Sequence, residues 1–521
     1  MKRLIILVFA LAVFIPGYSQ GYKIQVKIDG LSNADLILGY HKDQSLIPYD
    51  TVKTDAKGNA VFKGDKKLTK GMYFVFLPNR TYFDFIVGDD QNFSIETDTT
   101  DLVKHLKIKG SPDNDLLKEY EKYMDEQSTK AKELQDKIKS AKNDKEKKKY
   151  IKQLENLKKQ WEDYTRKLAG EHPDLFASKF LLATLEPEVP DNIKDPLEKY
   201  IYLKEHYFDN FDFTDISMLY TPIYGNKIDT YLDRYILQHP DSLNAAVDYL
   251  LDKTKNNDEL YRYMLIHLFN KYARSKLMIA ENVYVHLADI YIKTATWDNS
   301  DFKKRLKTKI ARKKNCLIGN KALDLDIALL PQDSADIELL RDPLKQMKQQ
   351  GLKIEKEKPD FDSRVPELSQ LIADYMGNFP DYINLYDIKA DYIVLWFWDP
   401  ECSHCKKETP ELYKAWNDEL KDLGVKVVAV YLARNTDDWN HFCNHIGKWY
   451  TFVEKNHMYG DGWYNGWNPF ANSRFKYDIN ATPKVFLLDK DKKIIAKQIG
   501  VDDIKTIVEG MEKEKQKEKK K

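Results

Sequence analysis

The pattern of hydrophobic and polar positions divides the chain into three parts. In the first, from about residue 20 to residue 110, apolar residues alternate with polar ones over short runs, as at Tyr22, Ile24 and Val26. Turns rich in Gly, Asp and Asn separate these runs, which is typical of the short strands of a small β-sandwich. We therefore predict a β-sandwich-like module over residues 20–110, and its sequence contains no catalytic pattern.

From residue 111 to residue 314 the spacing of apolar residues becomes helical. Ile151, Leu154 and Leu157 recur at three-residue steps within a heptad-like seam. Asn143-Asp144 interrupts this pattern, so we expect two long charged helices that fold back on each other. A hairpin packed along its own seam is favoured over a coiled coil that binds a partner. The prediction is an all-α middle domain whose function the sequence does not indicate.

Beyond Cys316 the pattern becomes that of an α/β domain, predicted over residues 315–511 and followed by a charged tail at 512–521. The continuous apolar run at 392–398 is typical of a strand buried on both faces. The predicted elements, in chain order, are a buried strand (392–398), a helix (406–423) ended by Gly424, a buried strand (425–431), a helix (436–446), a hairpin that begins at Thr482-Pro483 (482–496) and a closing helix (502–511).

Length and charge limit the classes of function. At 521 residues the chain is too long for one ordinary core, and two to four domains are expected. Its 83 lysines and arginines nearly balance its 82 aspartates and glutamates. No overall field therefore favours nucleic acid as a partner.

The N-terminus has the pattern of a secretory signal peptide. Lys2 and Arg3 precede the apolar run from Leu4 to Ile15, and the small residues Gly17 and Ser19 flank the expected cleavage point after Ser19. A membrane anchor is less favoured, because roughly 18 or more apolar residues are needed to span a bilayer. We predict a signal peptide over residues 1–19, export to the periplasm or cell envelope, and no membrane span in the mature chain.

The cysteines carry the candidate chemistry. The four are Cys316, Cys402, Cys405 and Cys443, too few for a disulfide-stapled secreted scaffold. Cys402 and Cys405 form a Cys-x-x-Cys motif at a strand-to-helix junction, where unpaired backbone N–H groups stabilise a thiolate. The motif predicts a redox-active dithiol/disulfide with no other cofactor. A zinc site is disfavoured because the motif supplies only two of four ligands.

Several residues around this motif resemble a known family. Phe397-Trp398-Asp399-Pro400 leads into the two cysteines, Lys406-Lys407-Glu408 and Pro410 follow them, and Thr482-Pro483 comes later. The C-terminal part, residues 316–511, resembles the thioredoxin fold, and more closely the exported thiol-disulfide oxidoreductases of the TlpA/ResA group. The two forward modules resemble an arrangement common in exported proteins of Bacteroidetes-type bacteria.

Two stretches depart from that family's pattern. Gly319 to Ala322 fits the family's opening Gly-x-x-Ala-Pro hairpin, but Leu323 replaces the proline, and an insertion is expected near residues 331–381. The second atypical stretch, residues 457–475, is crowded with aromatic residues. Neither stretch falls between the motif and its helix, so both bear on substrate preference rather than on the motif.

The resemblance implies roles for the motif residues. Cys402 is the expected nucleophile, because exchange proceeds by thiolate attack through a mixed disulfide, and Cys405 is expected to resolve that intermediate. Glu408, on the same helical face as Cys405, is expected to accept or deliver its proton. The alternative for Glu408 is an ordinary acid in the first turn of a helix. Cys316 and Cys443 are expected to be buried free thiols, the alternative being an additional redox partner.

The same resemblance implies a substrate-binding surface. Pro483 is expected to follow a cis peptide bond that exposes the backbone of Thr482 to an extended substrate, with Trp398 beside it. His404, between the cysteines, is expected to tune the potency of the thiol. Oxidases and isomerases of this superfamily often carry histidine there, whereas TlpA/ResA-type reductants more often carry proline. The direction of electron flow is therefore left open.

The preferred function is an exported thiol-disulfide oxidoreductase. Its expected partners are protein or peptide thiols and an upstream thiol-disulfide electron donor or acceptor. One alternative is a peroxiredoxin-like peroxidase, which needs a Pro-x-x-x-Thr-type loop and an arginine that this motif lacks. The other is an envelope ligand-binding protein in which the β-module or the aromatic stretch captures a ligand and the redox domain is accessory.

Overall fold

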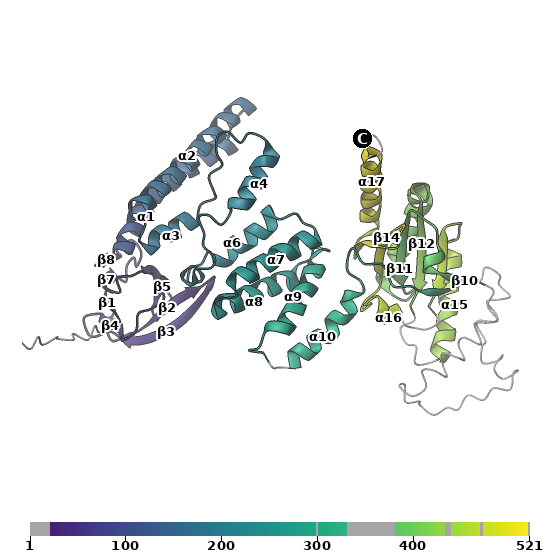
Figure 1. Ribbon diagram of the computed structural model, residues 1–521, viewed down its shortest axis with the longest axis horizontal. Coiled ribbons are helices and arrows are strands. Elements are labelled where there is room, and N and C mark those ends of the chain that lie inside the picture. Colours follow the sequence, from purple (N-terminus) through teal and green to yellow (C-terminus); the bar gives the residue numbers. More distant parts are fainter. Residues whose placement is uncertain (1–20, 299–300, 331–380, 433–438, 469–472, 519–521) are drawn as a thin grey trace, which may run out of the picture. The chain divides into compact units, whose positions relative to one another are not determined.

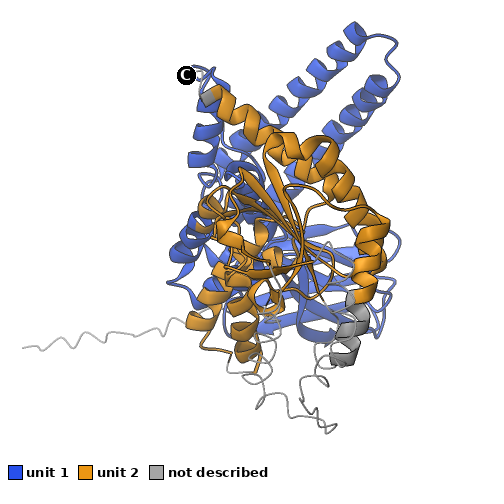
Figure 2. Ribbon diagram, turned by 90° about the vertical axis from the view of Figure 1, so that its right-hand side faces the viewer, with its two compact units in different colours: residues 1–238, 245–267 blue, residues 239–244, 268–521 orange. Residues whose placement is uncertain are grey.

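The structure is a computed structural model, and its described residues are 21–298, 301–330, 381–432, 439–468 and 473–518, without the side chains of 439–446 and 518. By internal contacts the chain forms two compact units, residues 1–238 with 245–267 and residues 239–244 with 268–521 (Figure 2). The predicted signal peptide lies outside the described residues, and so does nearly all of the predicted insertion near 331–381.

The N-terminal part is a β-sandwich of two four-stranded sheets. Along β1 buried and exposed residues alternate, as the period of a half-buried strand requires. Ile24 and Ile95 from one sheet share a core with Val75 and Phe85 from the other. The first sheet has the order β4 (Asn59–Gly64), β1 (Tyr22–Asp29), β7 (Asn92–Asp98), β8 (Lys107–Lys109), and the second β3 (Ser45–Lys53), β2 (Asp35–Lys42), β5 (Gly71–Phe76), β6 (Tyr82–Val87).

The middle region is helical and begins with a long hairpin of helices α1 and α2. Asn143 caps α2, because its side chain accepts a hydrogen bond from the backbone N–H of Glu146. The rings of Tyr123 and Tyr164 stack across the hairpin with centroids 3.8 Å apart. The helices are α1 (Pro112–Lys139), α2 (Asp144–Glu171), α3 (Phe176–Ala183), α4 (Pro196–His206), α5 (Ile216–Leu219), α6 (Tyr224–Thr230) with a π-helical turn (Tyr231–Tyr235), α7 (Pro240–Thr254), α8 (Asp258–Arg274), α9 (Ala280–Thr294) and α10 (Asp301–Lys314).

The C-terminal part is a seven-stranded mixed sheet with helices around it (Figure 1). Strands β11, β12 and β13 are parallel, and β14 runs antiparallel to β11. The strand order is β10 (Tyr382–Asn384), β9 (Asp326–Leu329), β13 (Trp463–Trp467), β12 (Val425–Tyr431), β11 (Tyr392–Trp398), β14 (Lys484–Asp489), β15 (Ile494–Lys497), and the helices are α14 (Ser403–Ala415), α15 (Trp439–Lys455), α16 (Ser473–Lys476) and α17 (Val501–Glu518). A β-sandwich, a helical middle and a C-terminal α/β domain confirm the predicted fold class.

Strand β11 lies at the centre of two cores. All seven of its residues are buried, and alternate residues face opposite sides of the sheet. Val394 and Trp396 belong to the core that also holds both motif cysteines, whereas Leu395 and Phe397 belong to the core on the other face. This burial on both faces explains the unbroken apolar run in the sequence.

The structure differs from the expected elements in three places. The helix expected at 436–446 is α15, which begins at Trp439 and continues to Lys455. Part of the aromatic stretch at 457–475 is strand β13, which pairs with β12 and places Trp463 in the core. The closing helix continues past Met511 to Glu518, and Glu512 accepts a hydrogen bond from the hydroxyl of Tyr392 at 2.8 Å. Among the helices that the structure describes, none combines the length and apolar character that crossing a membrane requires.

Candidate active site

The dithiol motif lies where strand β11 passes into helix α14. A turn joins the two elements, in which the backbone N–H of Cys402 donates to the carbonyl of Asp399 at 3.0 Å. Cys402 is the residue before the first helical one, and its carbonyl accepts from the N–H of Lys406 at 3.0 Å. The first N–H groups of a helix have no partner within the helix. The turn therefore holds the sulfur of Cys402 beside unpaired backbone donors.

Helix α14 is fixed to the sheet by its buried face. Cys405, Thr409 and Leu412 are buried at four- and three-residue steps, which places them on one side of the helix. The hydroxyl of Thr409 accepts a hydrogen bond at 3.1 Å from the indole N–H of Trp396 in β11. Thr409 is a supporting residue absent from the predicted site, although its four-residue spacing from Cys405 was a visible signal.

The two thiols have opposite electrostatic environments. Both are free; Cys402 is 9 % exposed and Cys405 is 0 % exposed. Burial raises the pKa of Cys402, but hydrogen bonds from the N–H of Cys405, the thiol of Cys405, Thr482 and the N–H of His404 outweigh it, so the net pKa is lowered. Burial raises the pKa of Cys405 to about 12. A slightly exposed thiol with a lowered pKa thus lies beside a fully buried thiol with a raised pKa.

The Thr482-Pro483 segment lies against the first thiol. The peptide bond between the two residues is cis, as predicted. The thiol of Cys402 donates to the carbonyl oxygen of Thr482 at 3.2 Å, so residues 80 positions apart meet at the sulfur. Trp398 is fully buried, and its ring packs against Phe452 with centroids 5.5 Å apart. In this structure Trp398 supports the core behind the dithiol, and its contact with substrate stays a prediction.

His404 and Glu408 lie on the outer side of α14. The His404 side chain is 79 % exposed, and its Nδ1 is 4.0 Å from Oε1 of Glu408, whose side chain is 35 % exposed. The structure thus pairs Glu408 with His404, whereas its predicted exchange of a proton with Cys405 stays a prediction. His404 contributes to the lowered pKa of Cys402 through its backbone N–H. The prediction from sequence concerned the imidazole side chain and did not include this backbone contribution.

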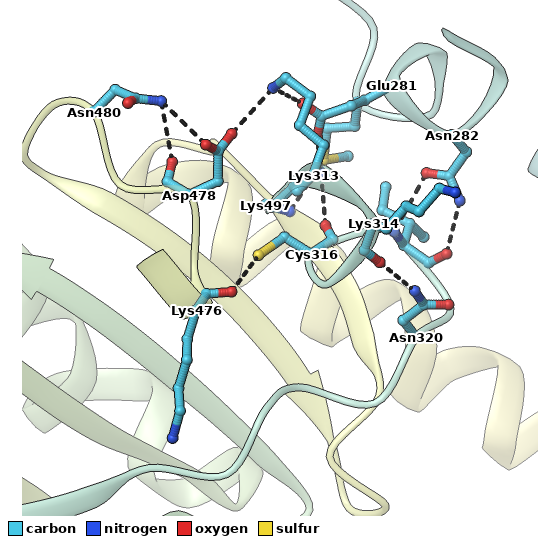
Figure 3. A network of polar contacts seen from close by, with 12 residues as sticks. Glu281, Asn282, Lys313, Lys314, Cys316, Asn320, Lys476, Asp478, Asn480 and Lys497 are labelled. Atoms are coloured by element: carbon cyan, nitrogen blue, oxygen red, sulfur yellow. Dashed lines mark hydrogen bonds and ion pairs between the residues drawn. The ribbon is translucent and has the colours of Figure 1, made fainter. Parts of the chain in front are cut away.

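The other two cysteines lie apart from this site or outside the described side chains. Cys316 is a buried free thiol whose Sγ donates to the carbonyl of Lys476 at 3.4 Å (Figure 3). Burial raises the pKa of Cys316 to about 12, which disfavours its thiolate. The side chain of Cys443 is not among those described, so its state stays a prediction.

Comparison with known proteins follows the same division of the chain. Residues 390–494 match a thioredoxin-like family, residues 22–117 a domain of unknown function (DUF4369), and residues 126–314 a second domain of unknown function (DUF5106). A thiol-disulfide oxidoreductase ResA from Bacillus thuringiensis (strain Al Hakam) and one from Bacillus anthracis are each 28% identical over 152 residues. This match covers 29% of the chain and 76% of each relative.

Two solved structures illustrate the similarity. A thioredoxin-like protein from Bacteroides caccae is 17% identical, with a TM-score of 0.40, and the match covers 62% of the chain and 97% of that protein. The thioredoxin domain of a thiol-disulfide oxidoreductase from Bacteroides vulgatus is 28% identical, with a TM-score of 0.21, over 25% of the chain and 86% of that domain. The family match and the ResA relatives agree with the dithiol geometry: the C-terminal domain is thioredoxin-like, and the chain is a TlpA/ResA-like protein of the thioredoxin superfamily.

Proposed function

We propose that the chain is an exported thiol-disulfide oxidoreductase that exchanges disulfides with protein or peptide thiols through Cys402 and Cys405. The observation that carries this proposal is the contrast between the two thiols. Cys402 is the more accessible and has a lowered pKa, and Cys405 is buried with a pKa of about 12. Exchange needs such a pair: a thiolate that attacks readily, and a second thiol that stays protonated until the mixed disulfide has formed.

The reaction in the reducing direction has two steps. The Cys402 thiolate attacks one sulfur of the client disulfide, an S–S bond forms between them, and the other client sulfur leaves as a thiolate that takes up a proton. Cys405 then loses its proton and attacks the sulfur of Cys402, which releases the second client thiolate. Two electrons pass to the client, and Cys402 and Cys405 become a disulfide. The oxidising direction is the reverse of these steps.

Neighbouring residues are assigned supporting roles. The carbonyl of Thr482, 3.2 Å from the sulfur of Cys402, borders the position where the client chain must lie. Glu408 would relay the proton that Cys405 loses, since a half-exposed carboxylate can exchange protons with water. The Cys402–Cys405 couple is the redox group, and an upstream thiol-disulfide protein resets it.

Export is part of the proposal and is supported by the N-terminal sequence pattern. Lys2 and Arg3 precede the apolar run from Leu4 to Ile15. Cleavage after Ser19 would release a mature chain into the periplasm or cell envelope. Amino-terminal sequencing of the protein recovered from the envelope fraction tests this part by itself, and a chain that keeps Met1 in the cytosolic fraction would contradict it.

Trapping the intermediate tests the chemistry. The Cys405→Ser variant, incubated with a disulfide-bonded model protein, should accumulate a mixed disulfide at Cys402, because the second step is blocked. The Cys402→Ser variant should form none and should have no exchange activity. Cys316→Ser is the matched control and should behave as the wild type, since Cys316 lies in the core on the other face of the sheet. Absence of a trapped species in Cys405→Ser would contradict the assigned order of attack.

A further inference from the structure

Helix α10, the last helix before the thioredoxin-like domain, is strongly basic. Its fourteen residues include eight lysines and arginines and a single aspartate, Asp301. The chain as a whole carries a formal net charge of only +1, so this positive charge is a local feature. Helix α10 belongs to the same compact unit as the dithiol, which permits its position relative to the active site to be described.

A groove lies between α10 and the loop that follows α16. Its volume is about 610 Å³, and its walls include Arg305, Lys309 and Arg312 from the helix and Asp478 and Asn480 from the loop. We call this the basic groove. Its volume is within the range of about 300–1,000 Å³ that is usual for sites binding small molecules, which is large enough for a few side chains.

Five cations line the basic groove, and two of them are paired with carboxylates: Lys304 with Asp301, and Lys313 with Glu281 and Asp478. Among the described residues, Arg305, Lys309 and Arg312 have no carboxylate within ion-pair distance. Asp478 is already held by Lys313, whose Nζ lies 3.2 Å from Oδ2 of that aspartate (Figure 3). Such a concave surface focuses a positive potential and attracts anionic groups.

Aromatic rings support two of these cations. The guanidinium of Arg312 lies over the ring of Phe475, 5.0 Å from its centroid, and Nζ of Lys309 lies 5.5 Å from the ring centroid of Tyr284. Cation–π contacts of this kind favour these positions of the side chains without neutralising their charge.

The basic groove lies next to the position that a client must occupy. Asn480 in its wall is two residues from Thr482, a separation that the backbone spans in at most about 7 Å. The carbonyl of Thr482 is 3.2 Å from the sulfur of Cys402. A client polypeptide whose reactive cysteine lies at Cys402 therefore reaches the basic groove within a few of its own residues.

We propose that the basic groove binds an acidic segment of the client polypeptide, a few residues from the client's reactive cysteine. This inference rests on the proposed function, because it takes the occupant of Cys402 to be a polypeptide. Charge complementarity identifies the chemistry of the segment as glutamate- or aspartate-rich. A polypeptide is favoured over a lipid or a nucleic acid because the loop that forms one wall of the groove leads within two residues to Thr482, beside the reactive sulfur.

Two matched peptide disulfides test this inference with the purified full chain. One carries four glutamates beside its cysteine, and the other carries glutamines in their place. At low ionic strength the wild type should have a kcat/KM about tenfold higher for the acidic peptide, as expected for electrostatically steered association. The advantage should fall as salt approaches 1 M, where charges are screened within about 3 Å.

Charge variants locate the effect. The triple variant Arg305→Gln, Lys309→Gln, Arg312→Gln should lose the preference and keep its rate with the neutral peptide. Gln is a good helix former, and Lys313 is kept because it holds Asp478. The matched control, Lys307→Gln, Lys490→Gln, Lys493→Gln, removes the same charge from exposed lysines that do not line the groove, and it should keep the preference.

The outcomes separate this inference from the proposed function. No exchange with either peptide would overturn the proposed function, whereas exchange at equal rates with both peptides would overturn only the role of the groove. A cysteine-free acidic peptide, labelled for fluorescence anisotropy, reports binding without redox chemistry. Tighter binding to vesicles of anionic phosphatidylglycerol or to a DNA oligonucleotide than to this peptide would also overturn the assignment.

Discussion

Alkylation of the reduced protein should distinguish Cys402 from Cys405. Iodoacetamide reacts with thiolates, and the structure gives the two sulfurs different thiolate populations and different access to solvent. Alkylation is covalent, and the fold is unchanged until the iodoacetamide has reacted with a sulfur. It therefore measures the native environment of each sulfur directly.

The size of the difference follows from the two pKa values. At pH 8 a thiol with the ordinary pKa of 9.0 is about one-tenth thiolate, and Cys402, with a lowered pKa, exceeds that fraction. Cys405, with a pKa of about 12, is about one ten-thousandth thiolate. The more basic thiolate is the better nucleophile, which offsets about 20-fold of this thousandfold difference for a Brønsted coefficient of about 0.4–0.5. Cys402 should therefore react at least about 50 times faster, and the burial of Cys405 increases the ratio.

The assay is a time course at several pH values, quenched and quantified by peptide mass spectrometry. The alkylation rate at Cys402 should rise with pH, with its midpoint below pH 9, and should level off above that midpoint. The reason is that the Cys402 thiolate forms at lower pH than that of an ordinary thiol. The Cys405→Ser variant gives the alkylation rate of Cys402 without its neighbouring thiol, and the Cys402→Ser variant gives that of Cys405. Equal rates at the two cysteines, or a midpoint for Cys402 above 9, would refute the reasoning.

Two further substitutions, Glu281→Gln with Lys314→Gln as its control and Glu408→Gln, test the stability of the domain and the proton path of Cys405. Glu281→Gln should lower the free energy of unfolding in urea by about 3 kcal/mol, because it leaves the Lys497 side chain, which is 2 % exposed, without its carboxylate. The control Lys314→Gln removes the more exposed ion pair with Asp289 and should lower it by about 1 kcal/mol or less. Burial raises the pKa of Glu281, but the two lysines outweigh it and the net pKa is lowered, so this stabilisation should be present above pH 4.5 and disappear as pH falls through the folded-state pKa. Glu408→Gln should lengthen the lifetime of the mixed disulfide about tenfold or more in quenched-flow measurements without changing the alkylation rate of Cys402, and an unchanged lifetime would remove Glu408 from the proton path of Cys405.

Sequence patterns predicted the local parts of the site well. The apolar run at 392–398 coincides with strand β11, because burial on both faces leaves a continuous hydrophobic signature. Gly424 ends the helical segment with a φ of +76°, a left-handed conformation that glycine adopts without strain. The cis bond at Thr482-Pro483 followed from the resemblance rather than from any local propensity.

What the sequence did not reveal depends on contacts between distant residues. Strand β13 contains Trp463-Tyr464-Asn465-Gly466-Trp467, which lacks the β-branched alternation typical of strands, and it is held by pairing with β12 and β9. The ion pair between Glu281 and Lys497 joins residues 216 positions apart, and no periodicity marks it. The basic run in α10 was visible, but only the structure shows that it faces the loop before Thr482.

Redox titration of the Cys402–Cys405 couple tests the central claim most directly. The full chain is equilibrated in thiol-disulfide buffers over a range of potentials, quenched with acid, and analysed for free thiols at each cysteine. We predict that both thiols disappear together in one two-electron transition, at a potential within or near the range from about −270 to about −120 mV spanned by reductants and oxidants of this superfamily. Two cysteines that remain free thiols in every buffer, or that become oxidised independently of each other, would contradict the account.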